Sequence, residues 1–327
     1  MNKIVGIGNA LVDLLIKMED DELLDHLDFP KGSMQLIDLD KYKEINSLIA
    51  NKSTHLATGG SAGNTILALA CLGEAPGFIG KIGSDSYGQF YRSNLQKKNI
   101  KDHLIATDFL SGVASTFISP DGERTFGTYL GASSTLSTTD ISSSLFAGYE
   151  YLYVEGYLVQ DQELLLHIAR LAKNQSLKIC IDLASYNIVE ENIAFFKEFL
   201  REFVDVVFAN EEEARALTGR APKEALAYLA SFCDTVVIKL GAKGAVAQYG
   251  DQICIGSATS VDHVVDTTGA GDFFAAGFLY GLIQERSLEC CLELGALLSG
   301  SVIQVVGTDL EDEKWNEIKL KVGEIGG

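Results

Sequence analysis

A single carboxylate stands near the start of a strongly apolar helix in the segment DTTGAGDFFAAGFLYGL, residues 266 to 282. Asp272 is the only charged residue after the first position of this segment, and it follows Gly269, Ala270 and Gly271. Helix N-termini present unpaired N–H groups, and glycine lets an anion approach them closely. Asp272 could simply cap its own helix. Alternatively, it could take the proton of a hydroxyl group that attacks a phosphoryl group held there.

Two further segments combine single polar residues with glycine. In GNALVDLLI, Asp13 is the lone acid of an apolar stretch. As a structural residue, it could be the acid of a turn. In ATGGSAGNTILALACLG, Gly59 and Gly60 precede a helix with Asn64 in its first turn. On this segment alone, a flexible turn before a polar helix start explains the pattern as well as a binding role does.

Acidic residues also stand where strands are expected to end. In FANEEEARALTG, Glu213 follows Asn210 at the start of a helix, where the helix dipole alone would favour acidic residues. In VEGYL, Glu155 could contact a substrate or cap the next helix. For both segments, a binding role and a purely structural role at the start of a helix remain alternative interpretations.

The long motif VVDTTGAGDFFAAGF resembles the C-terminal signature of the ribokinase-like (PfkB-type) kinases of sugars and nucleosides. Matching features extend from residue 6 to about residue 307. The resemblance implies that Asp272 is the catalytic base. It also implies that the backbone of Gly269, Ala270 and Gly271 forms the anion hole for the transferring phosphoryl group.

The resemblance also implies the substrate-binding residues. Asp13 would receive a pair of substrate hydroxyl groups, Asn64 would bind another hydroxyl group, and the Gly59–Gly60 pair would be the hinge of a lid. Met34 and Leu36 would line the wall that faces the base of a nucleoside or the far end of a sugar. The substrate contacts implied in this way are Asp13, Met34, Gly59, Gly60 and Asn64. Glu155 is a further candidate contact, with capping of the next helix as the alternative.

Nucleotide contacts are implied in the second half of the chain. Asn210 and Glu213 resemble the N-x-x-E element of the family, in which the acid holds Mg²⁺ through water. The segment VIKLGAKGA resembles the phosphate-loop strand, with close approach allowed at Gly241 and Gly244. Lys239 stands where family members often have threonine, so a lysine contact with the phosphates would replace a hydroxyl contact.

Asp266 resembles the acidic residue beside the monovalent-cation site of many family members. The cofactors expected from the resemblance are therefore ATP and Mg²⁺, with K⁺ at Asp266. The segments FPKGSMQLID, SPDGERTFGTYLGA and GALLSGSVIQVVG are similar to those of the adenosine-kinase-like branch.

The elements that must position these residues follow from the apolar pattern. Short buried strands alternate with helices, which predicts an α/β fold with a mostly parallel sheet covered by helices on both faces. The expected strands are Ile4–Gly8, Gly77–Gly80, Tyr151–Val154, Lys178–Asp182, Val204–Ala209, Thr235–Leu240 and Ala245–Tyr249. The expected helices are Ala62–Leu72, Ser86–Lys98, Gln162–Asn174, Ile188–Phe199, Glu211–Leu217, Lys223–Ser231, Ala270–Gln284 and Leu288–Val306.

One segment departs from this alternation. In GVASTFISPDGERTFGTYL, two β-rich runs flank Pro120-Asp121-Gly122, which predicts a hairpin. We expect residues 1–327 to form a single ribokinase-like kinase domain, with a small β lid built from segments near 13–40 and 108–131.

Composition excludes several classes of protein. The net charge of −19 and the lack of a basic stripe argue against a nucleic-acid partner. The six cysteines form no C-x-x-C pair, and no apolar run has membrane-spanning length. The segment GIGNAL has Leu11 in place of the third glycine of a dinucleotide fingerprint, and GFIGKIG lacks the P-loop spacing. With no secretory leader in the sequence, we expect a cytoplasmic protein, a monomer or a homodimer joined through the lid.

The sequence therefore predicts an ATP-dependent kinase that phosphorylates a hydroxyl group, a primary CH₂OH, of a sugar or nucleoside. The acceptor would be an adenosine-like nucleoside or a ribose- or fructose-like sugar. The alternative is a non-catalytic nucleotide or sugar sensor on the same fold, which would have no need of the base at Asp272.

Overall fold

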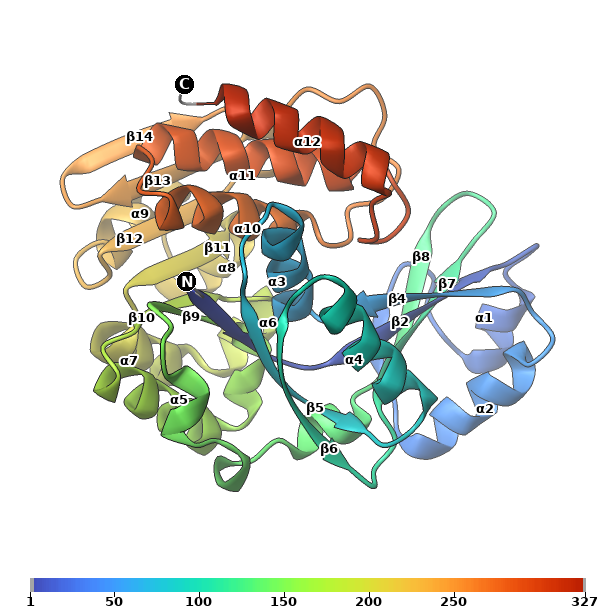
Figure 1. Cartoon of the computed structure of the whole chain (residues 1–327). Helices are drawn as coiled ribbons and strands as arrows, with labels where there is room; N and C mark the ends of the chain where they lie inside the picture. The colour runs from blue at the N-terminus through green and yellow to red at the C-terminus, as the bar shows by residue number, and fades with distance from the viewer. Residues whose placement is uncertain (1–2, 326–327) are drawn as a thin grey trace.

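The structure, a computed structural model, describes residues 3–325 and contains two separate β-sheets (Figure 1). The larger sheet has nine strands in the order β14-β13-β12-β11-β10-β9-β1-β5-β6. These strands are β1 (Ile4–Ile7), β5 (Gly77–Gly83), β6 (Lys101–Thr107), β9 (Tyr151–Glu155), β10 (Lys178–Asp182), β11 (Val206–Asn210), β12 (Thr235–Lys239), β13 (Ala245–Tyr249) and β14 (Gln252–Gly256). Neighbouring strands run parallel except at the β12–β13 and β13–β14 pairs, so the prediction of a mostly parallel sheet is confirmed.

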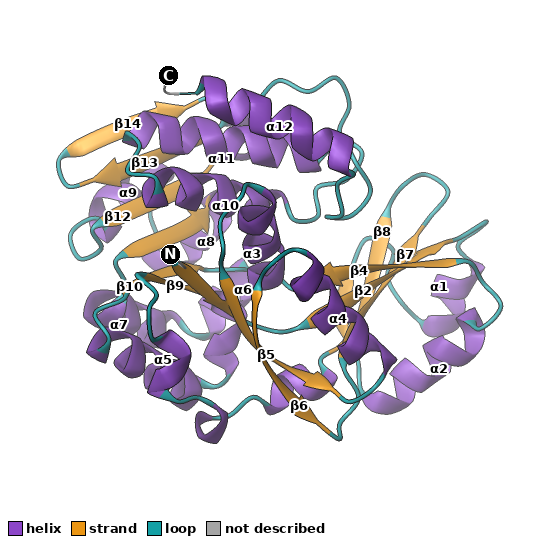
Figure 2. Ribbon diagram, in the orientation of Figure 1, coloured by secondary structure: helices purple, strands orange, loops and turns teal. Residues whose placement is uncertain are grey.

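Helices cover both faces of the larger sheet because its strands are apolar on both sides (Figure 2). Within β9, Tyr153 packs into one hydrophobic cluster, whereas Leu152 and Val154 pack into the other. The first cluster contains residues of α3 (Ser61–Cys71), α4 (Ser86–Lys97), α10 (Ala270–Ile283), α11 (Leu288–Val302) and α12 (Asp312–Glu324). The second contains residues of α5 (Gln162–Asn174), α6 (Tyr186–Glu191), α7 (Ile193–Phe203), α8 (Glu211–Thr218) and α9 (Pro222–Leu229).

The smaller sheet has five strands in the order β3-β8-β7-β2-β4. These are β2 (Leu11–Lys17), β3 (Met34–Leu36), β4 (Thr54–Gly59), β7 (Gly112–Ile118) and β8 (Arg124–Tyr129). Its apolar face packs against α1 (Glu22–Leu27) and α2 (Leu39–Ile49). The predicted hairpin is confirmed, because β7 and β8 pair antiparallel around the predicted turn.

The register of the smaller sheet places several predicted residues on its other face. Asp13 pairs with Ala114 across the sheet, and Ala114 pairs with Thr128. Phe126, two residues before Thr128 on β8, pairs with Met34. Residues that pair across strands, or that are two apart on one strand, share a face. Asp13, Arg124, Phe126 and Met34 therefore share the face that is not packed on α1 and α2.

The segment expected to be one helix at Ile188–Phe199 is two helices, so that prediction was wrong. Asn192 separates α6 from α7 with φ −128° and ψ 25°, and its Nδ2 donates to the carbonyl of Ile188 at 3.0 Å. Such a side-chain bond competes with the regular helical pattern. The expected helix from Leu288 ends at Val302 rather than Val306. The strands and α-helices that were not predicted are β4, β6, β14, α1, α2 and α12. Within residues 3–325, no helix is both long enough and apolar enough to cross a membrane.

Candidate active site

Asp272 lies where α10 approaches α3. It is the third residue of α10, which starts after Gly269 at φ +73°. Its Oδ1 accepts a hydrogen bond from Ser61 Oγ at 2.7 Å, and its Oδ2 accepts one from Asn64 Nδ2 at 2.8 Å. The carboxylate thus forms hydrogen bonds with two residues of α3.

Burial raises the pKa of Asp272 to about 6, and the nearby Asp182 adds to this increase. The hydrogen bonds from Asn64 and Ser61 act in the opposite direction. At neutral pH the carboxylate is mostly ionised, yet its pKa is close enough to 7 for proton transfer to be effective in both directions. These properties suit a general base.

Of the two glycines before Asp272, Gly269 has a clear steric reason to be glycine. A Cβ on Gly269 would lie 2.4 Å from Thr308 Cγ2, and its positive φ disfavours other residues. A Cβ on Gly271 would lie 3.1 Å from Lys239 Nζ, so this lysine ends beside the first turn of α10. The backbone N–H groups of that turn and the ammonium group together form an environment that favours anions.

A cavity of about 430 Å³ opens over this turn and collects the residues predicted to bind nucleotide. Its lining includes Asn210, Glu213, Lys239, Gly241, Gly244, Gly269, Ala270, Gly271 and Asp272. Ser61, Tyr157, Asp182, Ala184, Phe274 and Ser299 complete it. The cavity thus brings together Ser61 and Asp272, which are more than 200 residues apart in sequence and share a hydrogen bond.

Lys239 forms an ion pair with Asp182, with Nζ and Oδ2 separated by 2.6 Å. Burial lowers the pKa of Lys239, but Asp182 and Glu213 outweigh this effect and raise it overall. The amine therefore stays charged and is available to anionic groups in the cavity. Sequence reasoning missed Asp182, although its position at the end of the expected strand Lys178–Asp182 is one where ligands often bind in parallel sheets.

Asn210 and Glu213 form a reciprocal capping box at the start of α8. Glu213 accepts from the Asn210 backbone N at 2.8 Å and from Asn210 Nδ2 at 2.7 Å, and its own N–H donates to Asn210 Oδ1 at 2.8 Å. Only 2% of Glu213 is exposed, and burial together with Asp182 raises its pKa. The carboxylates of Asp182 and Glu213 supply the oxygen chemistry that would suit a hydrated Mg²⁺ ion.

Asp13 is close to the glycine pair that ends β4. A Cβ on Gly59 would lie 2.3 to 2.6 Å from the carboxylate atoms of Asp13, so only glycine leaves room for this acid. Gly60 has φ +84°, and a Cβ there would lie 2.1 Å from the carbonyl oxygen of Asn9. Burial raises the pKa of Asp13 to about 7, and Asp272 adds to the increase while Arg124 opposes it. The two predicted acids are thus electrostatic neighbours.

Two other predicted site residues, Asp266 and Met34, lie outside the lining of the cavity of about 430 Å³. Asp266 forms an ion pair with Arg124, with Oδ2 2.7 Å from Nη1, and accepts from the backbone N–H groups of Thr268 and Gly307. Arg124 comes from the hairpin and was not predicted as a site residue. Met34 is 51% exposed on the edge strand β3, so the structure does not enclose it in the cavity.

Glu155, at the end of β9, is 1% exposed and contacts the protein's own N–H groups. Its Oε1 accepts from Asn9, and its Oε2 accepts from the N–H of Ala62 at 3.1 Å. Asn64, besides its bond to Asp272, accepts from Thr308 Oγ1 at 3.2 Å. Both residues therefore already have partners within the protein.

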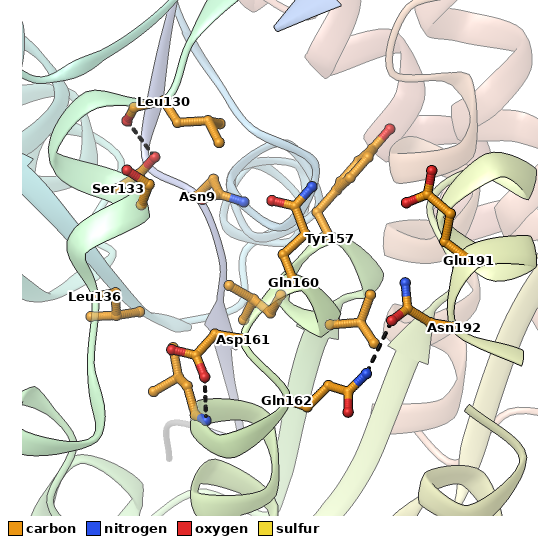
Figure 3. Close-up of a pocket in the computed structure, with 14 residues that line it drawn as sticks. Asn9, Leu130, Ser133, Leu136, Tyr157, Gln160, Asp161, Gln162, Glu191 and Asn192 are labelled. Atoms are coloured by element: carbon orange, nitrogen blue, oxygen red, sulfur yellow. Dashed lines mark hydrogen bonds between the residues drawn. The ribbon is translucent and has the colours of Figure 1, made fainter. Parts of the chain in front are cut away.

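A second cavity, of about 790 Å³, is shown in Figure 3. Tyr157 lines both cavities. The residues of the second cavity come from the β1–β2 connection, from η1 (Gly131–Thr135), from η4 (Gly156–Gln160) and from the ends of α5 and α6. The lining residues are Asn9, Leu130, Ser133, Ser134, Leu136, Tyr157, Leu158, Val159, Gln160, Asp161, Gln162, Leu164, Glu191 and Asn192. This lining contains amides, hydroxyls, two carboxylates and apolar side chains, and it contains no lysine or arginine among the described residues.

Comparisons with known proteins agree with this geometry. The profile of the pfkB family carbohydrate kinase matches residues 32–315. A probable sugar kinase protein from Rhizobium etli CFN 42 is 32% identical, with a TM-score of 0.87 and 98% of each chain covered. The adenosine kinase from Sinorhizobium meliloti is also 32% identical, with a TM-score of 0.85, and the match covers 98% of this chain and 99% of that one.

A curated relative, the guanosine-inosine kinase of Escherichia coli (strain K12), is 27% identical over 231 residues. The match covers 67% of this chain but only 53% of that protein, so the chain spans about half the length of this relative.

Proposed function

Because the chain belongs to the pfkB family of carbohydrate kinases, we propose that it transfers the γ-phosphoryl group of ATP to a primary hydroxyl group of a sugar or nucleoside. The observation that carries this proposal is the position of Asp272, a carboxylate with a pKa of about 6 beside the N–H groups that start α10. A side chain that only capped α10 would not need the hydrogen bonds to Ser61 and Asn64 on α3.

The steps follow from the residues around the first cavity and from Asp13 on the smaller sheet. Asp13 accepts hydrogen bonds from two hydroxyl groups of the acceptor and so orients it. Asp272 takes the proton of the attacking hydroxyl group. The N–H groups of Gly269, Ala270 and Gly271 stabilise the charge on the transferring phosphoryl group. Lys239, Gly241 and Gly244 line the space for the other phosphates, which a lysine and a glycine-rich backbone suit.

The metal proposals concern two different acids. Glu213 would hold Mg²⁺ through water, and the ion would neutralise phosphate charge. Asp266 stays a proposed K⁺ ligand, with Arg124 as its present cationic partner. The smaller sheet is proposed as a lid over the acceptor, within one kinase domain of residues 1–327. A cytoplasmic location and a monomeric or lid-joined dimeric state stay predictions.

The second cavity favours a nucleoside as the acceptor. Tyr157 lines both cavities, and the second offers about 790 Å³ of space. A ribose or fructose would leave this space empty, whereas a base attached to a ribose would enter it. The lining offers amides and carboxylates to the polar edge of a base and contains no lysine or arginine for a phosphate or carboxylate on the acceptor.

A panel of acceptors tests this function directly. Adenosine, guanosine, inosine, ribose and fructose are compared with ATP, by release of ADP in a coupled assay. We expect higher kcat/KM for at least one purine nucleoside than for either sugar, and loss of activity when EDTA replaces Mg²⁺. The same assay in K⁺ and in tetramethylammonium tests Asp266. If none of the acceptors in the panel leads to ADP release, the proposal is contradicted. Equal rates in K⁺ and in tetramethylammonium would contradict a K⁺ site at Asp266.

The pH dependence of the reaction follows from two raised pKa values, about 6 for Asp272 and about 7 for Asp13. Asp272 must be ionised to accept a proton, and Asp13 must be ionised to bind two hydroxyl groups strongly. We therefore expect kcat/KM to fall as the pH drops below about 7, and to fall more steeply below about 6, because two groups then become protonated. A profile of kcat/KM between pH 5 and 9 measures this. A flat profile down to pH 5 would contradict both assignments.

A further inference from the structure

The chain crosses between the two sheets four times. It leaves the larger sheet after β1 and returns after β4, then leaves after β6 and returns after β8. The first two crossings, at residues 8–10 and at Gly60, lead directly to site residues. Asp13 lies just beyond the first crossing, and Ser61 and Asn64 lie just beyond the second. The placement of these crossings therefore sets the distance between the acceptor-binding acid and the partners of Asp272.

One buried carboxylate holds both of these crossings. Glu155 Oε1 accepts from the backbone N of Asn9 at 2.8 Å and from Asn9 Nδ2 at 2.5 Å. Glu155 Oε2 accepts from the backbone N of Ala62 at 3.1 Å. Glu155 itself is the last residue of β9, in the middle of the larger sheet. Its side chain thus links the larger sheet to the points where the chain enters and leaves the smaller one.

The glycines at the crossings make this link possible. A Cβ on Gly8 would lie 2.3 Å from Glu155 Oε2. At the second crossing, Gly60 lies against the carbonyl of Asn9, so the two crossings also touch each other. A larger residue at either glycine would separate the carboxylate from its donors.

The third crossing is held in the same way by another acid. Asp85 Oδ2 accepts from the backbone N of Ser111 at 2.8 Å, and its Oδ1 accepts from Ser111 Oγ at 2.6 Å. Asp85 also caps α4 by accepting from Gly88 N at 2.9 Å. Ser111 in turn accepts from Gly83 N at 2.9 Å through its Oγ, which ties the crossing to the end of β5. The carboxylates of Glu155 and Asp85 therefore accept hydrogen bonds from backbone N–H groups at three of the four crossings.

A buried carboxylate is a costly way to hold a fold together. Burial raises the pKa of Glu155 to about 7, which shows that the ionised form is disfavoured there even with its three donors. Packing with apolar side chains is often at least as stabilising as a buried charge. Hydrogen bonds do, however, fix direction and distance more closely than apolar contacts do, and catalysis is sensitive to displacements of about 1 Å.

We propose that Glu155 is a positioning residue that clasps the first two crossings and so holds Asp13 in register with Ser61, Asn64 and Asp272. Asp85 plays the same part at the third crossing. The catalytic consequence rests on the proposed kinase function, whereas the clasp itself rests on the contacts alone. Glu155 thus acts through the backbone of Asn9 and Ala62.

Steady-state kinetics of Glu155→Ala and Glu155→Gln test the catalytic consequence. We expect the acceptor kcat/KM of Glu155→Ala to fall about 10²-fold, as for misplaced reacting groups, while the KM for ATP stays unchanged. Glutamine keeps one oxygen acceptor but presents an amide NH₂ group to the other donor, so the kcat/KM of Glu155→Gln should fall between those of Glu155→Ala and the wild type. Glu150→Gln, an exposed acid just before the same strand, is the matched control and should behave as the wild type.

Amide hydrogen exchange tests the clasp independently of turnover. We expect faster exchange at Asn9 and Ala62 in both Glu155 variants, with protection in α5 and α7 unchanged. Asp85→Asn retains an oxygen to cap α4 but not the acceptor for Ser111 N, and exchange should increase at Ser111. If Glu155→Ala does not fold, Glu155→Gln, whose side chain has nearly the same size, decides on the first two crossings.

The two proposals fail in different ways. A wild-type protein that phosphorylates no acceptor would remove the proposed function, and exchange at Asn9 and Ala62 would still decide on the clasp. Glu155→Gln with wild-type exchange at both amides and a wild-type acceptor KM would overturn the clasp while leaving the kinase intact.

Discussion

Replacing Asp272 with asparagine should lower turnover by about 10²- to 10⁴-fold, the usual contribution of a positioned general base. Asparagine keeps the shape of the side chain and can still contact Ser61 and Asn64, so the arrangement of α3 and α10 should persist. What is lost is the group that accepts the hydroxyl proton. Turnover of the purified variant under saturating ATP and acceptor measures this loss.

Stability and nucleotide affinity serve as the controls for this variant. The folded-state pKa of Asp272 lies above its ordinary value of 3.8, so its ionisation costs stability as the pH rises through about 6. Removing the charge should therefore leave the melting temperature at pH 7.5 unchanged or higher. ATP affinity should be unchanged or tighter, because a negative charge near the phosphates is gone. A folded variant with near-native turnover would show that Asp272 is not the base.

The second large effect is expected at Asp13. In Asp13→Asn, two charge-assisted hydrogen bonds to the acceptor become weaker neutral ones. Hydrogen bonds to charged groups contribute about 1.5 to 3 kcal/mol each, so the acceptor kcat/KM should fall on the order of 10²-fold. The KM for ATP should not change, because Asp13 belongs to the smaller sheet rather than to the nucleotide cavity. Kinetics with each substrate varied in turn separate the two parameters.

Asp40→Asn is the matched control for Asp13→Asn. Asp40 lies on α2, beside the same sheet, but its side chain is 94% exposed. We expect wild-type kinetics from this variant. Equal acceptor kcat/KM in Asp13→Asn and Asp40→Asn would rule out hydroxyl binding by Asp13.

Much of the larger sheet could be predicted from the sequence because its strands are short, continuous apolar runs separated by helices. The smaller sheet was harder to predict. β2 reads LVDLLIK, whose acid interrupts the apolar run, and β3 has only three residues, with Met34 and Leu36 both exposed. Their strand character depends on pairing with β7 and β8, which local sequence does not contain.

The site residues likewise divide into those that the local sequence predicts and those that it does not. The GAGD segment identified Asp272 as a candidate because carboxylate and glycines are adjacent in sequence. Asp182 and Arg124 were missed because their partners, Lys239 and Asp266, are distant in sequence and meet them only in the fold. The role of Glu155 could not be decided for the same reason, since its donors Asn9 and Ala62 lie on other elements.

The central claim is that Asp272 promotes transfer of a phosphoryl group from ATP to a hydroxyl group of a bound acceptor. Its most direct test is to incubate the protein with ATP, Mg²⁺ and the best acceptor of the panel, and to locate the phosphate in the product by mass spectrometry and phosphorus NMR. The account predicts one phosphate on the primary hydroxyl group of the acceptor, formed by the wild type and not measurably by Asp272→Asn in the same time. Release of inorganic phosphate with an unmodified acceptor, or equal product from both proteins, would contradict it.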